Sequence, residues 1–143
     1  RGMLIMTGMR KETPADNKHI FTSGDGKVKI WAGVIDDLWK LGKPRGVGGP
    51  WKNTLVQAAQ ASDPYLIGFY DKKMLSITHD SKATVTFRME VDPTGHGPWM
   101  LYKEISVKPG EKFEYNFPDS FQARWIRFVT DRDCIATTWL TYH

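Results

Sequence analysis

The chain has 143 residues, of which 41% are hydrophobic and 25% charged, and this size and composition suit one globular domain with its own core. The formal net charge is +4, but the basic residues are scattered rather than gathered on one element, so we expect no nucleic-acid partner. No apolar run reaches the roughly 20 residues that span a bilayer, which predicts no membrane insertion, and a single cysteine excludes an internal disulfide.

The first 35 residues predict a strand and a β-hairpin. Residues 3–6 are apolar, and residues 20–22 and 28–34 flank the turn-forming run Ser23-Gly24-Asp25-Gly26. Two such runs around a glycine-containing turn are typical of paired antiparallel strands. We therefore assign residues 1–35 to an N-terminal strand and hairpin.

Residues 36–65 form a stretch rich in Gly and Pro, which predicts one short helical turn over 36–41 and then an irregular connecting loop. A long loop within a compact domain is usually functional or joins two units. Two rings, Trp39 and Trp51, flank its glycines, and Lys43 and Arg45 lie between them. Flat rings stack on sugars and basic side chains hydrogen-bond hydroxyls or carboxylates, so the loop is either a sugar-binding site or a collar that packs on a neighbouring domain.

Residues 66–143 alternate between apolar and polar side chains, which predicts strands at residues 74–78, 84–91, 102–107, 113–117, 125–129 and 135–142. Turn-forming residues separate these runs at short intervals, with no helical periodicity between them. The fold class we expect is all-β: an antiparallel β-sandwich, jelly-roll or Ig-like, over residues 66–143, preceded by the hairpin and the loop. The expected core residues are Leu75, Ile77, Val85, Phe87, Met89, Val91, Ile105, Val107, Phe113, Tyr115 and Phe117.

Catalytic motifs are weak throughout. Ser62, Asp63 and His79 supply the residue types of a hydrolase triad, but no Gly-x-Ser-x-Gly elbow surrounds the serine, so we assign no catalytic residue. Asp131 and Asp133 are two residues apart and are weak candidates for calcium ligands. We predict no other cofactor and no other metal.

One exposed ring is expected at a hairpin tip. Trp99 follows Gly95-His96-Gly97-Pro98, a turn that separates two predicted strands. Tyr65, Tyr70 and Asp71 border the start of the predicted sandwich and would complete a ligand site. The expected ligand is a polysaccharide or oligosaccharide, and the mild basic charge slightly favours an anionic one.

The chain also resembles a family. The segment Asp36-Asp37-Leu38-Trp39-Lys40-Leu41-Gly42-Lys43-Pro44-Arg45-Gly46, the later Gly48-Gly49-Pro50-Trp51 and Ser62-Asp63-Pro64-Tyr65, and the tail from Phe117 to Cys134 are similar to the C-terminal β-sandwich region of bacterial proteins that carry a β-propeller and are associated with polysaccharide degradation, many of them classed as glycoside hydrolases. On this resemblance, residues 1–35 look like the last strands of an adjoining propeller blade.

The resemblance implies a secreted or periplasmic protein whose catalytic centre lies outside these residues. The first hypothesis is a non-catalytic carbohydrate-binding or accessory module. The second is a structural sandwich that braces an adjoining propeller or catalytic domain. The third is a fragment of a glycoside hydrolase or polysaccharide lyase, so we leave open whether the chain is part of an enzyme.

Overall fold

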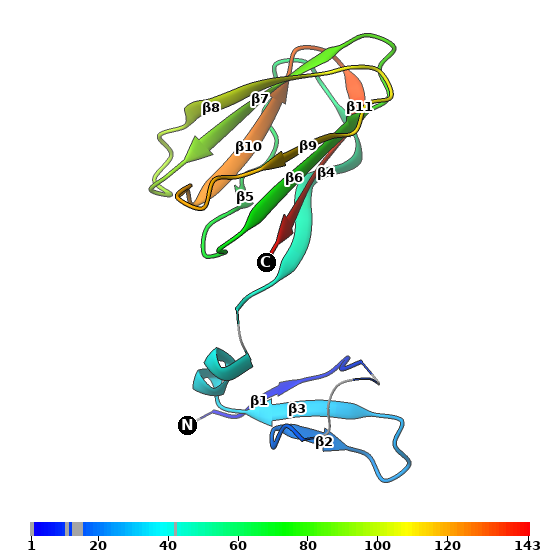
Figure 1. The fold of residues 1–143 in the computed structure, drawn as a ribbon, viewed down its shortest axis with the longest axis vertical. Coiled ribbons are helices and arrows are strands. Elements are labelled where there is room, and N and C mark those ends of the chain that lie inside the picture. Colours follow the sequence, from blue (N-terminus) through cyan, green and yellow to red (C-terminus); the bar gives the residue numbers. More distant parts are fainter. Residues whose placement is uncertain (1, 11, 13–15, 42) are drawn as a thin grey trace. The chain divides into compact units, whose positions relative to one another are not determined.

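The computed structural model describes residues 2–10, 12, 16–41 and 43–143, and it divides the chain into two compact units, Arg1–Lys43 and Pro44–His143 (Figure 1). Every strand pairing in both units is antiparallel among the described residues. In this described part of the chain, no helix is both long enough and apolar enough to cross a membrane.

The first unit is a small three-stranded sheet followed by one short helix. Strands β1 (Leu4–Met6), β2 (Ile20–Thr22) and β3 (Lys29–Gly33) lie in the order β1-β3-β2, which confirms the predicted hairpin between β2 and β3. The 3₁₀ helix η1 spans Ile35–Leu41, where a helical turn was predicted. Trp31 is the one buried hydrophobic residue in the described part of this unit, and it stacks on His19. A sheet of three short strands with so small a core has little stability of its own.

The second unit is a β-sandwich of two four-stranded antiparallel sheets (Figure 1). One sheet has the order β4-β11-β6-β9 and the other β5-β10-β7-β8. The strands are β4 (Gly46–Val56), β5 (Tyr65–Leu66), β6 (Lys73–His79), β7 (Val85–Asp92), β8 (Met100–Val107), β9 (Phe113–Asn116), β10 (Trp125–Thr130) and β11 (Cys134–Tyr142). The predicted fold class, an all-β protein with an antiparallel sandwich, is confirmed.

The core lies between the two sheets and is built by the predicted alternation. Of the eleven core residues expected from the sequence, nine are buried, while Phe113 and Tyr115 are half-buried and pack against the same cluster. Burying a large apolar side chain contributes about 1.5–3 kcal/mol, so a cluster of this size holds a domain of 100 residues together. The opposite faces of the strands carry mainly polar side chains, with a few half-buried rings such as Trp125 and Trp139.

The structure differs from the sequence prediction between residues 46 and 56, where it has a strand instead of a loop. Strand β4 pairs with β11 along the edge of its sheet. An edge position explains how the strand accommodates Pro50, because a proline that donates no hydrogen bond is tolerated there. The sandwich therefore begins at β4, well before residue 66.

Two register shifts interrupt the β4–β11 ladder, one on each side of the Trp51–Thr138 pair. Asn53 at one of them has a φ of 51°, a left-handed conformation seen at bulges. At the other, a Cβ added to Gly49 would lie 1.8 Å from the carbonyl oxygen of Thr138. The glycine is thus required by the close approach of the two backbones, which accounts for the glycine-rich sequence that resembled a loop.

Candidate functional site

The outward face of sheet β5-β10-β7-β8 carries a row of charged side chains. Phe87, Met89 and Val91 of β7 point into the core, so the residues that alternate with them point outward. Directly paired residues of neighbouring antiparallel strands share a face. Arg88 and Glu90 are therefore on the outward face together with their partners on β8 and β10.

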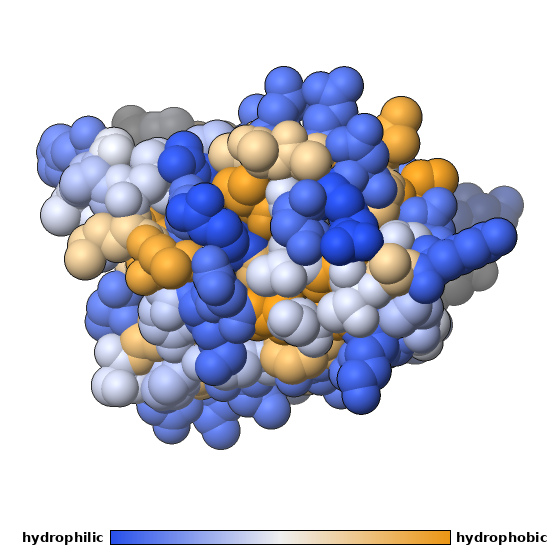
Figure 2. Space-filling model, turned by 90° about the horizontal axis from the view of Figure 1, so that it is seen from above, coloured by the Kyte–Doolittle hydropathy of each residue, from blue (hydrophilic) through white to orange (hydrophobic). Residues whose placement is uncertain are grey.

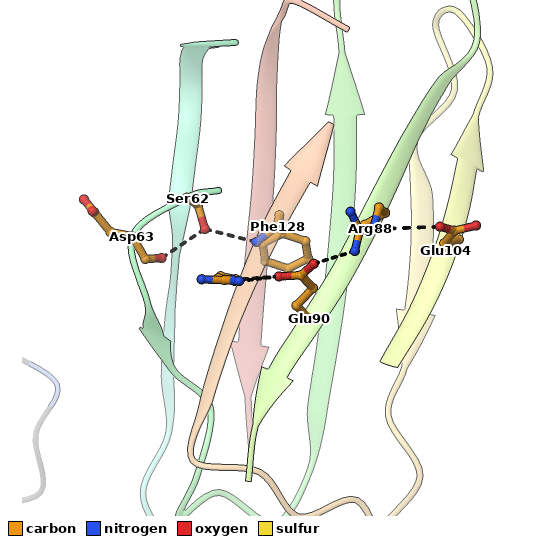
Figure 3. Close-up of polar contacts among 7 residues, drawn as sticks. Ser62, Asp63, Arg88, Glu90, Glu104 and Phe128 are labelled. Carbon is orange, nitrogen blue, oxygen red and sulfur yellow. Dashed lines mark hydrogen bonds and ion pairs between the residues drawn. The ribbon is translucent and has the colours of Figure 1, made fainter. Parts of the chain in front are cut away.

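Glu90 is the centre of this row and is only 7% exposed. Its Oε1 accepts a 2.8 Å hydrogen bond from Arg88, and its Oε2 accepts one of 2.7 Å from Nε of Arg127 on β10. Arg88 in turn lies 3.9 Å from Glu104 of β8, so the charges alternate across three strands (Figure 3). Because each oxygen of Glu90 accepts from a different guanidinium group, the carboxylate and the two arginines fix one another's orientations.

Trp99 covers one end of the row. The guanidinium carbon of Arg127 lies 4.3 Å from the centroid of the Trp99 ring, a cation–π contact. Trp99 is half-buried, and so is Trp125 of β10, whose indole nitrogen lies beside Gly95 in the same β7–β8 hairpin. The sequence predicted an exposed ring at this hairpin tip, whereas the structure has a half-buried ring that packs against Arg127.

Asp92 holds the Trp99 hairpin in shape. Its carboxylate accepts hydrogen bonds from the backbone N–H groups of Thr94, Gly95 and Gly97, at 3.0, 2.7 and 2.7 Å. Burial raises the pKa of Asp92, but these donors outweigh it, and the net effect is a pKa below the ordinary 3.8. Both glycines have positive φ angles, so the loop is fixed by its conformation as well as by its hydrogen bonds.

We predict that Asp92 makes the stability of the sandwich depend on pH in acid solution. Because its pKa is lowered by folding, its contribution is complete above pH 3.8 and is lost as the pH falls through the lower folded pKa. Asp92→Asn should therefore melt at a lower temperature than the wild type at pH 7, and the gap should close as the pH falls below 3.8. Thermal unfolding of both proteins at several pH values measures this. A gap that stays constant down to pH 2 would contradict the assignment.

A pocket of about 320 Å³ opens at the other end of the row. It is lined by Arg88 and Glu104 and by residues at the start of β7 and the end of β10, among them Thr86 and Asp131. Burial raises the pKa of Asp131, but the Thr86 N–H and Arg132 outweigh it and lower the pKa overall. Figure 2 looks onto the end of the sandwich where β10 runs into β11, and apolar surface appears there only as separate patches among hydrophilic residues.

Trp51, predicted as an exposed sugar-stacking ring, is instead part of the core. It is only 7% exposed and packs against Phe128, with 6.2 Å between the ring centroids. The prediction was wrong because residues 46–56 form a strand, and Trp51 falls on the side of that strand that faces the other sheet. One edge of Trp51 does line a second pocket, with Gln57 and Gln60.

The structure distributes the other predicted site residues over separate places. Trp39, which is 86% exposed, and Lys43 belong to the first unit, whereas Arg45 belongs to the second. Tyr70 stacks on Tyr142, with 4.0 Å between the ring centroids. Tyr65 and Tyr70 pack against the core cluster, and burial first, and then these two tyrosines, raise the pKa of Tyr142 well above its ordinary value. Asp71, which follows Tyr70 in the sequence, is exposed.

The predicted calcium candidates bind different loops. Asp131 accepts a hydrogen bond from the Thr86 N–H, whereas Asp133 accepts one from the Ala58 N–H. Within the described residues, no three His, Cys, Asp or Glu side chains come together as a metal site. The calcium prediction thus has no geometric support in this part of the chain.

Two of the three triad residue types, Ser62 and His79, have structural partners for their side chains. The Ser62 hydroxyl donates to the carbonyl of Asp63 and accepts from the N–H of Phe128, which fixes the β4–β5 segment to β10 (Figure 3). The Nε2 of His79 donates to the carbonyl of Val107 at 2.9 Å. These contacts give Ser62 and His79 a place in the hydrogen bonding of the sandwich.

Sequence reasoning missed Arg88, Glu90 and Arg127. The signal that was available is the alternation in β7, which places Arg88 and Glu90 outside the core, and the same alternation in β10, which places Arg127 there too. What the sequence does not show is that β7 and β10 are neighbours in the sheet, because β8 and β9 lie between them along the chain.

Comparison with known proteins adds nothing to this geometry: no protein-family description matches the chain, and neither a curated protein nor a solved structure matches it.

Proposed function

We propose that the sandwich is a non-catalytic carbohydrate-binding module of a polysaccharide-degradation system, and that its site is the outward face of β7 and β10 around Trp99. The observation that supports this most directly is the oriented Trp99 ring beside the row of Arg127, Glu90 and Arg88. A flat ring offers stacking area to a sugar, and guanidinium groups fixed by a buried carboxylate offer hydrogen bonds to its hydroxyls.

The rigidity of the site favours binding over catalysis. Glu90 is occupied on both oxygens by arginines, so it is a hydrogen-bonding anchor and is poorly suited to give up or take a proton. Asp92 is likewise used by the hairpin backbone. A pre-organised surface loses little entropy when a ligand binds, which suits a module whose task is attachment.

We predict that Trp99→Ala abolishes or strongly weakens glycan binding and leaves folding nearly intact. Loss of one stacking ring should weaken affinity about ten-fold or more, equivalent to about 1.4 kcal/mol or more. The melting temperature should change little, because a cation–π pair near the surface contributes only about 0.5–1 kcal/mol. Affinity gel electrophoresis against neutral and anionic polysaccharides, with thermal unfolding alongside, measures both quantities.

Trp139→Ala is the matched control. Trp139 is also half-buried on an outward face and also has a cation over its ring, Lys52 at 4.9 Å, but it lies on the other sheet. Its removal should leave glycan affinity unchanged. Equal effects of the two substitutions would place the site elsewhere, and no retardation of the wild type on any gel would reject carbohydrate binding.

The second candidate function is to brace a neighbouring domain, and the exposed apolar surface of the first unit favours it. Of the thirteen large hydrophobic side chains that are exposed among the described residues, seven lie in this small unit: Met3, Ile5, Phe21, Val28, Val34, Ile35 and Trp39. Exposed apolar groups at this density usually mark an interaction surface. Failure of all polysaccharides to retard the wild type would leave this as the favoured function.

A further inference from the structure

The row of charged residues runs from Trp99 at one end to a pocket at the other, and this course suggests what kind of glycan the face binds. Arg88 contacts Glu90 on one side and lies near Glu104 on the other, and both Arg88 and Glu104 line the 320 Å³ pocket. The exposed fraction of the side chains rises along the row, from 9% for Glu90 to 48% for Arg88 and 57% for Glu104. The row therefore emerges from under Trp99 into an open pocket.

The length of this surface follows from strand geometry. Asp92, opposite Trp125, is at one end of β7, and Thr86, which lines the pocket, is near the other. Six residues of extended strand span about 20 Å. That distance accommodates several sugar residues in line, whereas a single sugar would leave either the ring or the pocket unused.

The charge of the surface is balanced. Arg127, Glu90, Arg88 and Glu104 alternate in sign, and Asp131 at the pocket is paired with Arg132. Residues 44–143 contain 12 Lys and Arg against 11 Asp and Glu, a net charge of +1, while residues 1–43 contain 8 against 5 and so carry +3 of the total of +4. The basic character of the sequence is thus located mainly outside the sandwich.

We infer that the outward face binds an uncharged polysaccharide as an extended chain lying along β7, from Trp99 and Trp125 at one end to the Arg88–Glu104 pocket at the other. This inference rests on the proposed function. A neutral chain gains hydrogen bonds from both signs of charge through its hydroxyls. An anionic chain would have to lie against Glu104 and Asp131, the exposed carboxylates of this face, and like charges at such distances repel.

The test is the dependence of affinity on chain length and charge. We would first compare xylan, galactomannan and hydroxyethylcellulose with alginate and polygalacturonate by affinity electrophoresis of the full chain. Oligosaccharides from the dimer to the hexamer of the best neutral polymer would then be titrated calorimetrically. We expect retardation by a neutral polymer, and the hexamer to bind at least ten-fold more tightly than the dimer.

Glu104→Ala distinguishes the contribution of the pocket to binding from that of the Trp99 ring. It should weaken hexamer binding several-fold and leave dimer binding unchanged, because only a longer chain reaches from Trp99 into the pocket. Glu114→Ala is the control, since Glu114 is a similarly exposed glutamate on β9 of the other sheet, in an ion pair with Lys112.

The outcomes distinguish this inference from the proposed function. Equal affinities for dimer and hexamer, or preferential binding of the anionic polymers, would overturn the inference of an extended neutral chain. Carbohydrate binding at Trp99 would still stand if Trp99→Ala abolished the binding that is observed. Absence of binding to every polymer would overturn both.

Discussion

Trp51→Ala should destabilise the sandwich by about 3–5 kcal/mol, the usual effect of removing a buried aromatic side chain. Trp51 packs on Phe128 within the cluster between the two sheets, so its removal leaves a cavity that β4 and β10 cannot easily close. Chemical denaturation monitored by circular dichroism measures the free energy of unfolding. Had Trp51 been an exposed binding ring, as its place among the glycines predicted, the same substitution would have left stability nearly unchanged.

Leu55→Ala is the control on the same strand. Leu55 is an exposed hydrophobic residue of β4, so its truncation should change the free energy of unfolding by no more than about 0.5 kcal/mol. If the two substitutions were equally mild, the burial of Trp51 would be in doubt, and with it the placement of β4 in the sandwich.

Gly49→Ala should also be strongly destabilising, by about 3 kcal/mol or more. A Cβ at this position would meet the carbonyl oxygen of Thr138 at 1.8 Å and the α-carbon of Trp139 at 3.2 Å. Both atoms are backbone, so relief requires β4 and β11 to separate. Differential scanning calorimetry should show a lower melting temperature and a smaller unfolding enthalpy if the ladder is partly lost.

Gly46→Ala tests whether the effect is specific to that close approach. Gly46 lies on the same strand, and an added Cβ would meet only Tyr142 and Tyr70 side-chain atoms at 3.7 Å, an ordinary contact. This substitution should be nearly neutral. Equal losses at the two glycines would indicate that strand β4 tolerates no side chain at all and would remove the argument from the Thr138 carbonyl.

The parts of the fold that could be predicted from the sequence are those in which one face of a strand is buried and the other is not. Val85, Phe87 and Met89 alternate with polar residues, and the strand and its core face follow from that alternation. Strand β4 lacked this signal because Gly49 permits a close backbone approach to β11 and Pro50 is accommodated at the sheet edge, while glycine and proline are also typical of loops. Local composition cannot separate the two cases.

The candidate site could be predicted only in part, for a reason of topology. Trp99 was identified because a hairpin tip is a local feature. Arg127 became its partner only through the pairing of β7 with β10, which are separated in sequence by β8 and β9. Trp51 was assigned by its proximity to basic residues in the sequence and Tyr70 by its place at the start of the predicted sandwich, although Trp51 lies in the core and Tyr70 packs against it.

The pairing of β4 with β11 has a mechanical consequence. Gly46 pairs with Tyr142, so the point where the chain enters the sandwich is beside the point where its last strand leaves. A force that pulls residues 44 and 143 apart would act across one end of the ladder and open it pair by pair, from Tyr142 toward Cys134, instead of shearing all the hydrogen bonds together. We therefore expect the sandwich to yield at low tension in a single-molecule stretching experiment, with β4 peeling away from β11 first and withdrawing Trp51 from the core.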